Sequence, residues 1–205
     1  MKKELSYFTI NDEFGGNQDW FTNVVMHIGG CAAATACDSC IYFARQFKME
    51  KLYPFDAWNL TKLEYVAFSQ KMKPYLRPRI HGVNKLWMFT EGFGKYLHDV
   101  GVPFLKMEEF SGERSFEEAR EFIREKIDQD IPVPYLMLNH KNRKEFEDFI
   151  WHWFLAVGYE EQESAADGRF LIRTATYGEE TWLDLEKLWD TKEGQRGGLI
   201  GYKIA

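Results

Sequence analysis

Apolar residues recur at every third or fourth position in several stretches before residue 130, which is the spacing of one helical face. Helices are therefore predicted at 31–48, 61–72, 85–100 and 115–129. The first is rich in alanine, which indicates close packing against a large partner, and the last begins with the capping-box pair Ser115 and Glu118. Residues 1–30 carry glycine and asparagine turn signals and are predicted to form a loop or an extended arm.

Beyond residue 130 the pattern changes to short apolar or aromatic runs separated by turn-rich segments, which is typical of an antiparallel sheet. Strands are predicted at 104–110, 132–139, 151–159, 169–174, 181–183 and 199–204. Helices first and strands later predict an α+β fold, in which an N-terminal helical part with a buried central helix packs on a C-terminal sheet. We expect a single domain over 1–205, with a helical insertion at roughly 50–100.

Composition supports a packed protein. Of the 205 residues, 45% are apolar and 17% aromatic, which is enough to bury a large core. The net charge is −6, and acidic and basic residues are mixed along the chain without a basic stripe, so a nucleic-acid partner is not expected. No apolar run has the length of a membrane span or of a signal peptide, which predicts a cytoplasmic protein with no membrane partner.

Two of the three cysteines, Cys37 and Cys40, form a C-x-x-C pair inside the helix predicted at 31–48. Both fall on its apolar face, more than one turn from its start, whereas a redox pair is expected at a helix start. The sequence offers no matching second pair of zinc ligands. We therefore interpret both cysteines as packing residues and expect no metal and no cofactor.

Cys31 differs, because it immediately precedes that helix and follows two glycines. The glycines let the backbone turn sharply and leave the sulfur uncrowded. A thiol at this point lies near the unpaired N–H groups of the helix start, which favour the thiolate and can hold a developing oxyanion. The alternative is an ordinary helix entry with a small residue.

Four segments, in this order, resemble the papain-like superfamily of cysteine peptidases. They are GGCAAATACD at 29–38, SFEEAREFIREKIDQDIPVPYLML at 115–138, HWFLAVGY at 152–159 and FLIRTATYGEETWLDLEKLWD at 170–190. The sequence is most similar to the bacterial branch related to the double-glycine leader peptidases that process bacteriocins. The resemblance implies a papain-like fold and a peptide or small amide as substrate.

Carried over by position, the resemblance makes Cys31 the nucleophile and His152 the general base. Without it, His152 would be interpreted as a core histidine of an aromatic strand. Strand alternation places His152 on the face of Phe154 and Ala156, and we expect the small residues on that face to leave room for the Cys31 helix.

Two positions depart from the family pattern. The aspartate or asparagine that orients the histidine is replaced by Thr174, and Asp184 or Glu179 could substitute for it. The oxyanion-hole glutamine is expected a few residues before the nucleophile, but Gln18, the best candidate, lies thirteen positions upstream, and Asn23 is a weaker one. Of the other histidines, His140 is the reserve base, and the remainder are interpreted as surface or structural residues: His27, His81 and His98.

The sequence thus favours a cysteine peptidase or amidase acting through a Cys31 thioester, or an acyltransferase that uses the same pair. Loss of the acidic orienter supports an alternative, a catalytically impaired papain-fold protein that binds a peptide or another partner. A redox protein using the C-x-x-C pair is a third possibility.

Overall fold

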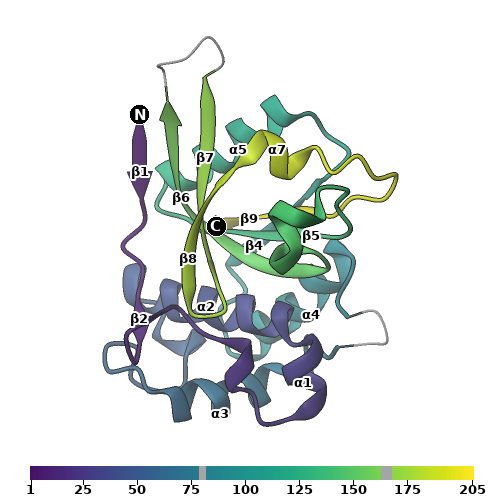
Figure 1. The fold of residues 1–205 in the computed structure, drawn as a ribbon. Helices are drawn as coiled ribbons and strands as arrows, with labels where there is room; N and C mark the ends of the chain where they lie inside the picture. The colour runs from purple at the N-terminus through teal and green to yellow at the C-terminus, as the bar shows by residue number, and fades with distance from the viewer. Residues whose placement is uncertain (79–81, 163–167) are drawn as a thin grey trace.

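The computed structural model describes residues 1–78, 82–162 and 168–205 of the chain. Its centre is a seven-stranded sheet in the order β4-β9-β5-β6-β7-β8, with β1 pairing beside β6, and every pairing is antiparallel (Figure 1). A two-stranded sheet is formed by β2 and β3. The strands are β1 (Lys2–Glu4), β2 (Thr9–Ile10), β3 (Glu13–Phe14), β4 (Leu105–Ser111), β5 (Val133–Met137), β6 (His152–Gln162), β7 (Arg169–Thr176), β8 (Glu179–Asp184) and β9 (Gly198–Ile204).

The helices lie on both faces of the large sheet. In Figure 1, α1 to α4 lie on one side of the sheet, where α2 and α4 contact its strands, and α5 and α7 lie on the other side. Their bounds are α1 (Val24–Gly29), α2 (Cys31–Gln46), α3 (Lys62–Met72), α4 (Leu86–Asp99), α5 (Phe116–Asp128), α6 (Arg143–Phe146) and α7 (Leu185–Trp189), with short 3-10 turns η1 (Gln18–Trp20), η2 (Glu50–Leu52) and η3 (Glu147–Phe149). No helix in the described parts of the chain has the length and apolar character needed to cross a membrane.

The mixed α and β class and the large antiparallel sheet are confirmed, as are the four predicted helices and the six predicted strands. The capping box of α5 is present, with the Ser115 hydroxyl accepting from Glu118 N–H and the Glu118 carboxylate accepting from Ser115 N–H. The prediction of a loop or arm for residues 1–30 is wrong in part. That segment contains α1 and also β1, which pairs with β6.

Helix α2 is buried along nearly its whole length, between α3 and η2 on one side and β6 on the other. Its apolar residues include Cys37 and Cys40, both fully buried, as expected of packing residues. Polar residues outside the apolar stripe are buried too, because partners satisfy them: the Ser39 hydroxyl donates to Thr35 O and accepts from Tyr202. The helix is therefore a central rod of the core rather than an amphipathic surface helix.

Helix α2 packs on the other face of β6 from the one predicted. Phe154 stacks on Tyr135, which in turn contacts Trp189 of α7, so the face of His152 and Phe154 lies toward α5 and α7. Helix α2 packs instead on the face of Trp153 and Leu155. The expectation that Ala156 makes room for α2 is therefore wrong, and His152 reaches the α2 side only because it stands at the very end of the strand.

Candidate functional site

Cys31 is the first residue of α2, and α1 ends only two residues before it. The chain can pass directly from one helix to the next because Gly30 packs against the last turn of α1. A Cβ atom at Gly30 would lie 2.3 Å from the carbonyl oxygen of Met26, so only glycine fits there without a shift of the backbone. The junction places the Cys31 sulfur at the positive end of a long buried helix.

The Cys31 side chain is 9% exposed, and burial raises the pKa of its thiol. The backbone N–H groups of Trp153, Ala32 and Cys31 itself oppose this shift, because they stabilise the thiolate. Burial is the larger effect, so the resting group is a neutral thiol. The contribution of Trp153 N–H also shows that the sulfur lies against β6, directly beside His152.

His152 begins β6 and is 4% exposed. Burial lowers the pKa of its imidazole to about 3, so the ring is neutral at pH 7. The residue before it, Trp151, has a φ of 54°, in the left-handed region that a bulky side chain rarely adopts. Its N–H donates to Leu138 O over 2.8 Å, which fixes this turn at the start of the strand.

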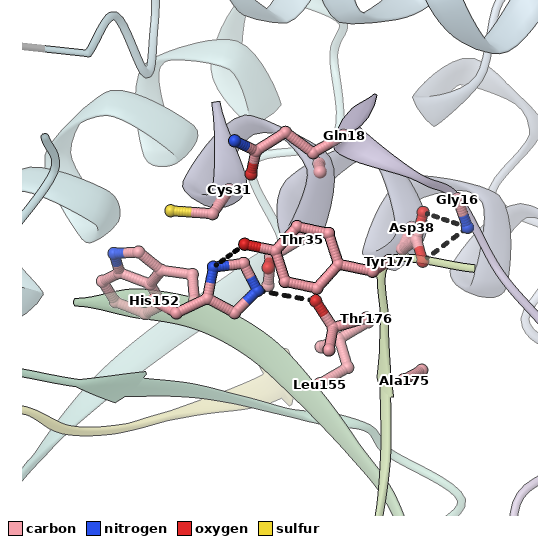
Figure 2. Close-up of a pocket in the computed structure, with 12 residues that line it drawn as sticks. Gly16, Gln18, Cys31, Thr35, Asp38, His152, Leu155, Ala175, Thr176 and Tyr177 are labelled. Carbon is pink, nitrogen blue, oxygen red and sulfur yellow. Dashed lines mark hydrogen bonds between the residues drawn. The ribbon is translucent and has the colours of Figure 1, made fainter. Parts of the chain in front are cut away.

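Two hydroxyl groups contact the His152 ring (Figure 2). Nε2 lies 2.6 Å from Thr176 Oγ1, and Nδ1 lies 3.3 Å from the hydroxyl of Tyr177. The Tyr177 and His152 rings are stacked at 7°, with centroids 4.5 Å apart, so the Tyr177 hydroxyl lies above the imidazole plane. The lone pair of a ring nitrogen lies in that plane. With Nε2–H donating to Thr176, the Nδ1 lone pair therefore remains available as a base.

The hydroxyl that orients His152 was expected from Thr174, and the structure gives this contact to Thr176 instead. Thr174 lies opposite Ala156 and donates to Thr181 O over 3.0 Å, so it holds β7 to β8. Thr176 lies on the same face two residues further along β7, at the level of the strand end where His152 stands. The nature of the expected partner, a neutral hydroxyl, is as predicted, but its position is not.

Gln18, in η1, is brought beside Cys31 despite the thirteen residues between them (Figure 2). Its Nε2 donates to His27 O over 2.7 Å, while its Oε1 is buried without a hydrogen-bond partner. Gln18 is 6% exposed. Asn23, the weaker candidate, caps the N-terminus of α1 by accepting from Met26 N–H and is therefore committed elsewhere.

Cys31, His152, Gln18 and Tyr177 line one internal cavity and one surface cleft. The internal cavity extends between α2 and β7 toward Asp38, as Figure 2 shows. The cleft has a volume of about 480 Å³ and is lined in addition by Trp151 and residues near Val83. Within the described residues, no hydrogen bond joins the sulfur to the imidazole, so the two groups share a site without being directly paired.

Asp38 is a buried acidic residue of this cavity that the sequence analysis did not select. Its carboxylate accepts from the hydroxyls of Tyr7 and Tyr65 over 2.7 Å each and from Gly16 N–H. Burial raises its pKa to about 6, although these hydrogen bonds oppose the rise. The bond to Gly16 ties the segment that carries Gln18 to α2. An aspartate inside an otherwise apolar helix is the sequence signal that could have identified it.

The other candidate residues lie outside this site. Asp184 caps α7, and Glu179 is exposed in β8. Both ring nitrogens of His140 are used, with Nδ1 accepting from Asn142 N–H and Nε2 lying 3.0 Å from Lys187 O. His27 is exposed on α1, His98 is exposed on α4, and His81 lies outside the described residues. Groups of three or more metal-ligating side chains are absent from the part of the chain that the structure describes.

Comparisons with known protein families, with curated proteins and with solved structures found no match to this chain.

Proposed function

We propose that this protein is a thiol-dependent acyl-transfer enzyme, most simply a peptidase or amidase, that forms a thioester on Cys31. The observation that carries the proposal is the meeting of Cys31 and His152 at one cleft, with a hydroxyl on His152 Nε2 and Gln18 beside the sulfur. A buried cysteine at a helix start, a base and an orienting group are the parts that nucleophilic catalysis needs. The resemblance to papain-like peptidases assigns the same roles to Cys31 and His152.

In the proposed reaction, the pair starts neutral, because burial raises the pKa of Cys31 and lowers that of His152. The sulfur forms a bond to the substrate carbonyl carbon as its proton passes to His152 Nδ1. The oxyanion lies toward the Cys31 backbone N–H at the start of α2. Nδ1 then returns the proton to the leaving amine as the C–N bond breaks. Water or another amine then attacks the thioester carbonyl carbon and gives a proton to Nδ1. The C–S bond breaks as the sulfur takes this proton back, which restores the thiol and releases the acid or the new amide.

The groups that contact His152 are neutral hydroxyls, and this limits the rate of acyl transfer. Thr176 orients the ring, but its hydroxyl carries no charge with which to stabilise imidazolium. An imidazole whose pKa is about 3 is also a weak base. We therefore expect a slow enzyme whose acylation is easiest with activated acyl groups.

Acetylation by p-nitrophenyl acetate tests the proposal. Intact-mass analysis with peptide mapping should find one acetyl group on Cys31, released with turnover. Cys31→Ser should remove this product, and His152→Ala should slow its formation about a hundredfold, the usual contribution of a general base.

Two histidine variants serve as controls. His98→Gln, at an exposed position of α4, should leave acetylation unchanged. His140→Gln tests the reserve base and should also leave it unchanged. Equal rates of Cys31 acetylation with and without His152 would contradict the proposal. A slower rate in His140→Gln would contradict it as well.

A partner-binding protein without catalysis is the second candidate function, and the absence of a charged orienter at His152 favours it. It predicts that p-nitrophenyl acetate forms no thioester on Cys31. The acetylation experiment therefore separates the two functions.

A further inference from the structure

Trp151, at the edge of the cleft, has a backbone conformation that is energetically unfavourable for its side chain. It is 49% exposed, although tryptophan is a large apolar residue, and its φ of 54° is strained for a bulky side chain. Seven described non-glycine residues have a positive φ, and only two of these are aromatic, Trp151 and Tyr177. Both flank His152. Tyr177 lies in the two-residue hairpin turn between β7 and β8, where a positive φ is usual, so Trp151 carries the backbone strain beside the reactive group.

The cleft beside Trp151 is lined by apolar side chains together with polar ones, Gln18 and Asn84 among them, and its polar surface is slightly larger than its apolar surface. Its walls include Val83, Leu136, Leu138, Ile150 and Ile28, and Cys31 forms part of its floor. None of its described lining residues is charged at pH 7, since His152 is neutral. The volume of about 480 Å³ is within the usual range of small-ligand pockets. An ionic group placed here would lose water and gain no counter-charge from these residues.

We propose that Trp151 determines the specificity of the Cys31 site, by packing against an uncharged apolar chain attached to the carbonyl that Cys31 attacks. The inference rests on the proposed function and names its substrate class. Trp151 forms the wall next to the base, so a chain bound against it is carried toward the sulfur. Trp151 keeps its left-handed backbone while its N–H donates to Leu138 O, which holds the residue at the start of β6.

The test uses alkylating reagents, which need only an accessible thiol and not acyl transfer. Folded protein is treated at pH 9 with N-methyl, N-butyl and N-hexyl iodoacetamide and with iodoacetate. The rate at Cys31 is divided by the rate of the same reagent with N-acetylcysteine. We expect this ratio to rise about threefold to fourfold for each methylene buried, until the cleft is filled. Iodoacetate should fall below the N-methyl reagent.

Trp151→Gly separates a binding role from a structural one. Glycine adopts a positive φ freely, so the variant should unfold at the same temperature or a higher one. In this variant, the logarithm of the rate ratio should rise with each methylene of the reagent less than half as steeply as in the wild type. Trp58→Ala, which removes another exposed tryptophan outside the cleft, should keep the full preference.

Rates that do not depend on chain length would overturn the inference, as would an unchanged slope in Trp151→Gly. A marked fall in its unfolding temperature would assign Trp151 a structural role instead. If chain preference appears while p-nitrophenyl acetate leaves Cys31 unmodified, the inference stands as a binding site and the acyl-transfer function fails. Absence of labelling at Cys31 in the folded protein would show that reagents do not reach the sulfur through the cleft, and would overturn the inference.

Discussion

His152 and Asp38 face the same internal cavity, and burial favours the neutral form of each. The consequences for stability run in opposite directions with pH. Neutral His152 stabilises the fold above pH 6.5, and this contribution is lost as the pH falls toward about 3. For Asp38 the neutral form is the acid, so its contribution is greatest at low pH.

We predict that Asp38→Asn changes the pH dependence of stability. The folded state holds the Asp38 proton up to a pKa of about 6, whereas the carboxyl of an unfolded chain releases it at its ordinary pKa of 3.8. The stability of the wild type relative to Asp38→Asn should therefore fall by about 3 kcal/mol between pH 3 and pH 7. Urea unfolding at several pH values measures this difference. A difference that grows with pH would mean that the two tyrosine hydroxyls outweigh the effect of burial.

Two threonines on one face of β7 provide a matched pair of variants. Thr176→Val removes the hydroxyl from His152 Nε2, and Thr174→Val removes a hydroxyl that holds Thr181 O. Each should cost about 1 kcal/mol of stability. Only Thr176→Val should slow acetylation of Cys31, by about tenfold. Equal slowing by both variants would show that the hydroxyl acts on the fold rather than on the histidine.

The candidate residues differ in how far sequence could identify them. Cys31 could be selected because it has a local signal, a glycine-cysteine helix start, whereas His152 could be selected only through the resemblance to papain-like peptidases. Thr176 could not be chosen over Thr174, since β6 and β7 shift register between Ala156 and Gly158. A one-dimensional alignment cannot place such a bulge. Tyr177 enters the site only through the turn between β7 and β8.

At the scale of elements, the junction between α1 and α2 positions the nucleophile. The residues of α1 were predicted to lie in a loop or an extended arm, because six residues give too short a periodic signal for a helix. The long helices could be predicted, since each has a full apolar pattern and a recognisable start or stop. What the pattern could not supply was which face of β6 receives α2.

Gly30→Ala tests the junction. The added Cβ would lie 2.3 Å from Met26 O, a backbone atom, so α1 or the start of α2 must shift. We expect a loss of about 2 kcal/mol in the free energy of unfolding and slower acetylation of Cys31. Gly194→Ala is the control, because its new Cβ meets no atom within 4 Å, and it should change stability by less than about 0.5 kcal/mol. Equal effects of the two variants would contradict the packing argument.

At the scale of the whole molecule, the core distinguishes the three free cysteines. Cys37 and Cys40 are fully buried in α2, whereas Cys31 lines the open cleft. We predict that one thiol reacts with an aromatic disulfide reagent in the folded protein and that the other two react only on unfolding. Their rates should follow the urea dependence of global unfolding. Rapid reaction of the C-x-x-C pair in the native state would revive the redox interpretation.

The position of β9 affects how the molecule can be assembled. This strand comes after every other strand in the sequence, yet it lies between β4 and β5, which do not pair with each other directly. A growing chain on the ribosome therefore cannot complete its sheet until β9 has emerged. Until then, the edges of β4 and β5 are unpaired and open to self-association, so premature termination before β9 should yield aggregates rather than a smaller working protein.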